Sequence, residues 1–145
     1  MRNMAMIIET KLVNEGFIPK RVHKMDVGYD LRSAEELNLY VGETRAVKTG
    51  VSVHMPGCVM GTVRGRSGLA TKGIFAHVGT IDSGYQGEIA VILHNTSQAA
   101  FKIEKGDRIG QLIFSTVLTP EFKIIEEFSA KSDRGTNGFG STGTV

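Results

Sequence analysis

Residues 46–64 have the sequence AVKTGVSVHMPGCVMGTVR, which contains two short apolar runs, 46–55 and 58–64, separated by Pro56 and Gly57. Valine and threonine recur in these runs, and β-branched residues favour extended strands over helices. Proline and glycine together are typical of a turn. This stretch therefore predicts two consecutive β-strands.

The same pattern continues on both sides of this stretch. Short apolar segments bounded by Gly, Asn, Asp or Pro occur at 7–13, 37–41, 74–81, 88–94, 99–103, 109–118 and 122–128. No segment keeps an apolar stripe of helical period over three turns, and only Ser67 to Lys72 is predicted to form a brief helix, weakened by Gly68 and capped by Gly73. The predicted fold class is all-β, a sandwich or barrel.

The composition bounds the class of protein. The 145 residues are 41% hydrophobic, which is enough to build one core without disulfide or metal. The formal net charge of +2 is too small for a duplex nucleic-acid binder, so no nucleic-acid partner is expected. The N-terminal apolar run is short and ends at Glu9 and Lys11, so we expect no signal peptide, no membrane partner and a cytoplasmic location.

Cysteine and histidine chemistry is not favoured. The single Cys58 lies in an apolar run and is expected to be a small buried hydrophobe rather than a nucleophile. His23, His54, His77 and His94 have no metal-ligand spacing, so a zinc site is not expected. We expect His54 and His94 to be strand residues with hydrogen-bond partners.

The 18 glycines exceed the usual share of about 7% and gather in three segments: RGRSGLATKG (64–73), SGYQG (83–87) and RGTNGFGSTG (134–143). Glycine lets a backbone approach a ligand closely and turn its N–H groups toward an anion. Each segment alone could be a solvated turn, and none has P-loop spacing. Two segments that combine arginine, hydroxyl and glycine nevertheless suggest a polyphosphate held from two sides.

Two carboxylates are candidates for chemistry. Asp82 follows an apolar strand and precedes Ser83 and Gly84, which suit a tight hairpin. Its side chain could reach into a cleft, or could bond backbone N–H groups of its own turn. Asp30 is either a turn residue or an oxygen ligand for Mg²⁺, direct or through water.

The last residues form a separate unit. We expect one β domain over 1–129 and a flexible C-terminal arm over 130–145, because the sequence from Ala130 is polar and glycine-rich. Such a tail is normally disordered. A lone Phe139 near Arg134 instead favours a segment that orders over a bound ligand, and both alternatives stay open.

Five segments taken together resemble, in order, the five motifs of the trimeric dUTPase family. They are DVGYDLRSAEE (26–36), GRSGLATKG (65–73), GTIDSGYQGEI (79–89), GDRIGQLIF (106–114) and DRGTNGFGSTG (133–143). Any one would be a weak signal, whereas five in order from 26 to 143 make a specific match.

The resemblance implies a jelly-roll-like β-barrel or sandwich, assembled as a homotrimer with a swapped C-terminal arm and active sites between subunits. It implies hydrolysis of dUTP to dUMP and pyrophosphate by in-line attack of water on the α-phosphate, with Mg²⁺ as cofactor. Such a dUTP diphosphatase limits uracil in DNA and supplies dUMP for dTMP synthesis.

The resemblance also assigns residues. Asp82 matches the general base that deprotonates water, and Tyr85 matches the aromatic that packs on deoxyribose and selects against ribonucleotides. The hairpin backbone from Gly79 through Ile81 to Gln86 matches the part that binds uracil.

The phosphates and the metal involve the other motifs. The matching phosphate binders are Arg66, Ser67, Gly68 and Gln111, and Asp30 matches the acid that reaches Mg²⁺ through water while the triphosphate mainly holds the ion. In the arm, Phe139 matches the ring that stacks on uracil. The residues that match γ-phosphate binders, or lie between them, are Arg134, Gly140, Ser141 and Thr142.

Three positions depart from the family pattern. Asn137 stands where glycine is frequent, and because Asn tolerates the left-handed backbone region, little harm is expected beyond a slower arm closure. Gly110 replaces a frequent alanine, and Gln86 replaces a frequent arginine, which puts any role of that charge in trimer contacts in doubt.

Two alternatives belong to other classes. A dCTP deaminase shares the fold and parts of the second to fourth motifs, but the fifth motif and YDLRSAE favour the hydrolase. Glu88 is expected to have a structural role. A non-catalytic β-sandwich binding module is the second alternative, and the presence of both Asp82 and the arm argues against it.

Overall fold

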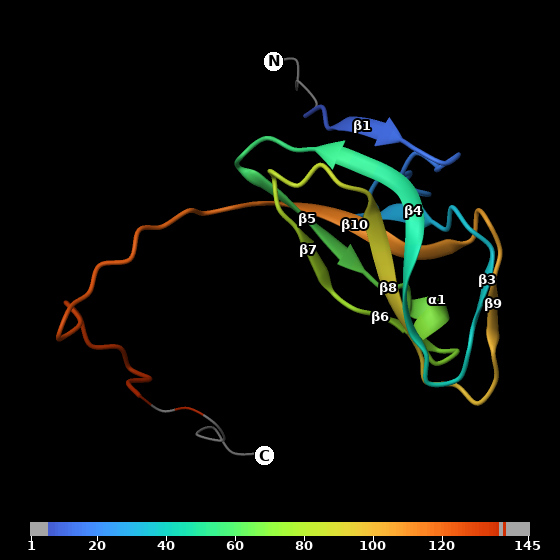
Figure 1. Cartoon of the computed structure of the whole chain (residues 1–145). Helices are drawn as coiled ribbons and strands as arrows, with labels where there is room; N and C mark the ends of the chain where they lie inside the picture. The colour runs from blue at the N-terminus through green and yellow to red at the C-terminus, as the bar shows by residue number, and fades with distance from the viewer. Residues whose placement is uncertain (1–5, 137, 139–145) are drawn as a thin grey trace.

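Figure 1 shows the computed structural model of the chain, in which residues 6–136 and 138 are described. In chain order the elements are β1 (Glu9–Leu12), β2 (Tyr29–Arg32), β3 (Leu37–Leu39), β4 (Thr44–His54), β5 (Val59–Arg64), α1 (Ser67–Ala70), β6 (Ile74–Ala76), β7 (Gly79–Ile81), β8 (Ile89–Asn95), β9 (Phe101–Ile103) and β10 (Arg108–Thr116). No helix within these residues is long and apolar enough to cross a membrane.

The strands form two four-stranded antiparallel sheets. Their orders are β1-β4-β8-β6 and β2-β10-β5-β7, and β3 with β9 forms a two-stranded ribbon. Buried and exposed side chains alternate along β5 and β8, as expected for strands with one face on a core. One continuous core contains Val47, Val51 and Val91 of the first sheet together with Val63 and Leu112 of the second. The predicted all-β sandwich is confirmed.

Three strand predictions differ from the structure. Residues 74–81 form two strands, because the chain leaves the first sheet after β6 and enters the second with β7. Residues 29–32 form β2, which the apolar pattern did not indicate because only Leu31 of this strand is buried. Residues 122–128 form no strand, and no strand in the described part of the chain pairs with them.

The segment after β10 extends away from the body of the protein (Figure 1). Its large apolar side chains are exposed: Leu118 at 89%, Phe122 at 98% and Phe128 at 88%. The boundary predicted between residues 129 and 130 stays a prediction, and β10 itself ends at Thr116.

The prediction that Cys58 is buried is wrong. The residue is exposed, because it lies in the turn between β4 and β5 that the Val59 N–H closes on the Pro56 carbonyl at 2.9 Å. The prediction for the strand histidines is confirmed. Nδ1 of His54 lies 3.0 Å from Gln86 Nε2, and Nδ1 of His94 lies 2.8 Å from Thr44 Oγ1.

Candidate active site

Three neighbouring strands place polar side chains in one row. Gln111 of β10 is paired in register with Asp30 of β2 on one side and with Arg64 of β5 on the other. Directly opposed residues of antiparallel strands point to the same face. The chain after β5 continues into Arg66 and α1, so further polar groups follow at the same edge.

These residues line a pocket of about 540 Å³, here called the Arg66 pocket. Five residues predicted for phosphate or metal binding line it: Asp30, Arg66, Ser67, Gly68 and Gln111. Arg64 and Asp26 line it as well. The structure thus brings together segments from the first, second and fourth motifs.

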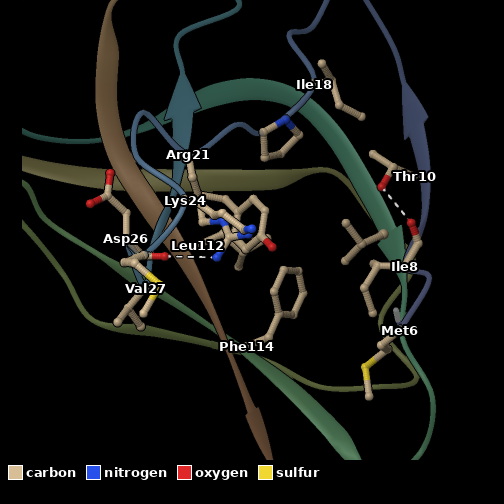
Figure 2. Close-up of a pocket in the computed structure, with 14 residues that line it drawn as sticks. Met6, Ile8, Thr10, Ile18, Arg21, Lys24, Asp26, Val27, Leu112 and Phe114 are labelled. Atoms are coloured by element: carbon tan, nitrogen blue, oxygen red, sulfur yellow. Dashed lines mark hydrogen bonds between the residues drawn. The ribbon is translucent and has the colours of Figure 1, made fainter. Parts of the chain in front are cut away.

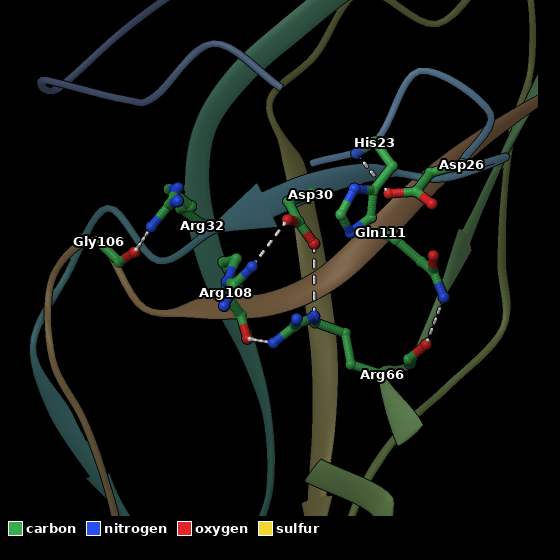
Figure 3. Close-up of polar contacts among 9 residues, drawn as sticks. His23, Asp26, Asp30, Arg32, Arg66, Gly106, Arg108 and Gln111 are labelled. Carbon is green, nitrogen blue, oxygen red and sulfur yellow. Dashed lines mark hydrogen bonds and ion pairs between the residues drawn. The ribbon is translucent and has the colours of Figure 1, made fainter. Parts of the chain in front are cut away.

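An ion pair and a hydrogen bond hold the Arg66 side chain in place. Its Nε lies 3.4 Å from Asp30 Oδ1, and its Nη1 donates to the Arg108 carbonyl at 3.3 Å (Figure 3). Arg108 Nη1 in turn lies 3.5 Å from the other oxygen of Asp30. The Asp30 side chain is only 16% exposed, so its charge is partly removed from water and balanced by two guanidinium groups. A fixed guanidinium suits the planar binding of a phosphate.

Gln111 is held in the same pocket by a close approach to glycine. Its Nε2 donates to the Gly65 carbonyl at 3.0 Å. A Cβ added at Gly28 would lie 2.1 Å from Gln111 Oε1, so only glycine at 28 leaves room for this side chain. Sequence reasoning missed Gly28 and Arg108, although both lie inside quoted motifs.

The turn after β7 carries Asp82. The Tyr85 N–H donates to the Asp82 carbonyl at 2.9 Å, so the backbone closes the turn and the carboxylate is not needed for it. Asp82 is exposed, and its side chain has no hydrogen-bond or ion-pair partner among residues 6–136 and 138. The carboxylate is therefore available for a ligand.

Asp82 lines a second pocket of about 420 Å³, here called the hairpin pocket. Gly79, Ile81 and Tyr85 line it too, whereas Gln86, the end of the segment predicted to bind uracil, lines a different pocket with His54. The turn at Ser83 and Gly84 is present, but the predicted hairpin pairing is wrong. The strands on the two sides of the turn belong to different sheets, and within the described residues no ladder joins β7 to β8. One backbone edge of β7 is consequently left for a ligand.

Tyr85 folds back over the segment that follows it. Its Oη donates to the Glu88 carbonyl at 3.0 Å, and a Cβ at Gly87 would lie 2.6 Å from the ring carbon Cζ. Gly87 is a further residue that sequence reasoning missed. The Gly50 N–H donates to Glu88 Oε1 at 2.8 Å, which confirms the structural role expected for Glu88.

Among the described residues of one chain, the two pockets share no lining residue. Arg134 lies in the exposed segment beyond β10. The remaining predicted arm residues, Phe139, Gly140, Ser141 and Thr142, lie outside the described residues, as does Asn137. A single chain therefore offers two partial sites.

A larger, mainly apolar pocket of about 620 Å³ shares Asp26 and Val27 with the Arg66 pocket but contains neither Asp82 nor Asp30 (Figure 2). Ile8, Ile18 and Phe114 line it, and Arg21 lies 5.0 Å from the centre of the Tyr29 ring. This pocket adjoins β1, an edge strand of its sheet, because Thr10 is among its lining residues.

Comparison with known proteins decides the family. The model of the dUTPase family matches residues 14–143, which include all five motifs. The chain belongs to the dUTPase family. A deoxyuridine 5'-triphosphate nucleotidohydrolase of Crocosphaera subtropica is 42% identical over 136 residues, covering 92% of this chain and 95% of the relative. One from Paramecium bursaria Chlorella virus 1 is 40% identical over 141 residues and covers 97% and 99%.

Solved dUTPase structures share the fold. The dUTPase of Staphylococcus bacteriophage 80alpha with dUPNHPP has a TM-score of 0.91 at 33% identity, covering 94% of this chain and 98% of that one. A mutant dUTPase of phage phi11 of S. aureus, described as coordinating a structural Mg(II) ion, has a TM-score of 0.82 at 29% identity and covers 86% and 99%. The family and fold predicted from the five motifs are confirmed.

Proposed function

We propose that the chain hydrolyses dUTP to dUMP and pyrophosphate. The observation that carries this proposal is the exposed carboxylate of Asp82, which has no side-chain partner among the described residues and lies in a pocket whose walls come from two sheets. Membership of the dUTPase family and the names of the relatives support it.

Asp82 acts as the general base. Its carboxylate accepts a proton from a water molecule while the water oxygen forms a bond to the α-phosphorus. The bond from that phosphorus to the bridging oxygen breaks, and pyrophosphate leaves with the electron pair. Asp82 later returns the proton to solvent. No protein nucleophile is required, because positioning and charge stabilisation dominate phosphoryl transfer.

The Arg66 pocket binds the triphosphate. Arg66 is already oriented by Asp30 and Arg108, so little side-chain entropy is lost when it meets phosphate oxygens. The Ser67 hydroxyl and the amide of Gln111 add neutral donors at the same edge. The space beside Gly68, near the start of α1, is free of protein atoms, since a Cβ there would meet no atom within 4 Å.

The hairpin pocket selects the nucleoside. Gly79 and Ile81 lie on a strand with one edge paired to β5. In this proposal the N–H and C=O groups of its other edge bind the donors and acceptors of uracil. The Tyr85 ring, held over Gly87, packs against deoxyribose and leaves no room for a 2′-hydroxyl.

The donor set fits magnesium brought in with the substrate. Among residues 6–136 and 138 no group of three or more His, Cys, Asp or Glu side chains could cage a metal. Mg²⁺ typically uses one or two carboxylates with waters and phosphate oxygens, and Asp30 and Asp26 both line the Arg66 pocket. Asp30, already paired with two arginines, would hold the ion through water. When bound, magnesium offsets negative charge on the phosphates.

In the proposed homotrimer, the hairpin pocket of one chain and the Arg66 pocket of another together form one complete site. The exposed apolar segment 117–128 of a neighbouring copy is the proposed occupant of the apolar pocket beside β1. Glu126 and Glu127 of that segment complement Arg21 and Lys24 at the pocket. Light scattering is expected to give the mass of three chains, and a monomer at working concentration would contradict this arrangement.

The arm completes the site over the bound nucleotide. In this proposal Phe139 stacks on uracil, and Arg134, Ser141 and Thr142 with Gly140 bind the γ-phosphate. Closure excludes water other than the nucleophile. The resulting cytoplasmic activity limits uracil in DNA and supplies dUMP for dTMP synthesis.

Measurement of pyrophosphate release with Mg²⁺ tests the proposal. dUTP is expected to be turned over far faster than UTP, dCTP or dTTP, and equal rates would refute the assignment of the hairpin. Deamination of dCTP is not favoured, because the Glu88 carboxylate is engaged by the Gly50 N–H. Ammonia release from dCTP would contradict this reasoning.

A further inference from the structure

The segment that follows the Asp82 turn is held by side chains rather than by packing. A Cβ at Gly84 would meet no atom within 4 Å, so the space beside the tip of the turn is open. Before the tip, β7 is fixed by its ladder to β5. After the tip, residues 85–88 lie outside any strand until β8 begins at Ile89.

Two side-chain contacts tie residues 85–88 to β4. Glu88 Oε1 accepts the N–H of Gly50, which lies in a bulge of β4 with a φ of 67°. Gln86 Nε2 lies 3.0 Å from Nδ1 of His54, the last residue of β4. The Gln86 amide donates to His54 Nδ1 in the tautomer that leaves this ring nitrogen unprotonated. This contact gives Gln86 a partner that the sequence did not indicate.

Tyr85 belongs to the same tied unit. Its ring lies over Gly87 and its Oη donates to the Glu88 carbonyl, so its position follows that of residues 86–88. Asp82, in contrast, directly follows β7 and is fixed from the other side. The contact between His54 and Gln86 therefore bears on the Tyr85 ring more than on the Asp82 carboxylate.

We propose that His54 is a positioning residue for sugar selection, which acts through Gln86 to hold Tyr85 against the nucleotide. This inference rests on the proposed function of the hairpin. Loss of the contact leaves Glu88 as the remaining side-chain tie to β4. The Tyr85 ring then samples positions that tolerate a 2′-hydroxyl, while Asp82 keeps its place on β7.

The test uses His54→Ala, Gln86→Ala and the double variant in the full-length protein. The matched control is His94→Ala, which removes another strand histidine with a side-chain hydrogen bond, to Thr44 at 2.8 Å. Steady-state kinetics with dUTP and UTP are measured together with amide hydrogen exchange of the peptide covering 83–88 in the absence of nucleotide.

Each single variant is expected to lower the preference for dUTP over UTP by about three- to tenfold, the equivalent of one neutral hydrogen bond. This loss should appear mainly as a higher KM for dUTP with kcat less affected. Amide exchange over 83–88 should become faster, and the control should match the unmodified protein. The double variant should lose no more than either single variant, because both remove the same contact.

Three results would overturn the inference: an unchanged preference in both single variants, additive losses in the double variant, or equal losses in the His94→Ala control. Gln86 is exposed, so Gln86→Ala still provides the answer if His54→Ala does not fold. Failure of the unmodified protein to hydrolyse dUTP would instead refute the proposed function. The exchange measurement needs no turnover, so it separates the two failures.

Discussion

Replacement of Gly28 by alanine tests how the Arg66 pocket is built. The new Cβ would lie 2.1 Å from Gln111 Oε1 and 2.9 Å from its Cδ, both closer than real Cβ contacts allow. The end of the Gln111 side chain must rotate away, since these atoms are its flexible part. Rotation breaks the hydrogen bond from Gln111 Nε2 to the Gly65 carbonyl and displaces a proposed phosphate donor.

The Gly28→Ala substitution is expected to have a small effect on stability and a larger effect on activity. Loss of one partly buried neutral hydrogen bond lowers the free energy of unfolding by about 1 kcal/mol, which corresponds to a fall in Tm of about 4 °C. The kcat/KM for dUTP should fall by about tenfold or more, because misplaced groups lose the advantage of orientation.

Thermal unfolding and steady-state hydrolysis of dUTP measure the two effects. Gly57→Ala is the matched control, since a Cβ there would meet nothing within 4 Å and should change neither quantity. In a Gln111→Ala background the Gly28→Ala change should cause little further loss. Normal kcat/KM for Gly28→Ala alone would refute the reasoning.

Three further predictions concern the hairpin and the arm. Asp82→Asn should keep binding of dUTP but lose hydrolysis, because base and phosphate binders are separate residues, and near-normal turnover would argue against its role. A chain that ends after Ser132 should remain a folded oligomer by light scattering with greatly reduced turnover; unfolding would show that the arm is structural. Tyr85→Ala should weaken the preference for dUTP over UTP, and an unchanged preference would assign sugar selection to another group.

The fold class was predictable because the strands are short and β-branched, and because β5 and β8 alternate buried residues with more exposed ones. β2 escaped this pattern because its residues other than Leu31 are only half-buried, and Asp30 among them lines the Arg66 pocket. Residues 122–128 have the apolar content of a strand, but no strand within residues 6–136 pairs with them. A local pattern indicates which side chains avoid water, but it does not identify the surface that covers them.

The site residues that could be predicted are those whose own side chains can bind a phosphate or a metal. Asp30, Arg66 and Gln111 could be named from the motifs, and strand order explains how they meet, since β10 lies between β2 and β5. Gly28 and Arg108 could not be identified, because their roles depend on contacts across strands. The burial of Cys58 was predicted wrongly, because the exposure of a residue in a turn depends on which other segments of the fold cover that turn.

Complementation between two inactive variants tests most directly whether the active site joins the hairpin pocket of one chain to the Arg66 pocket of another. Asp82→Asn and Arg66→Ala chains are refolded together and assayed for pyrophosphate release from dUTP. When the two variants are mixed at a ratio of one to one, trimers that contain both are formed. About a quarter of all sites should combine a native Asp82 from one chain with a native Arg66 from another. Recovery of activity to about that fraction is predicted, whereas a mixture as inactive as either variant alone would contradict the account.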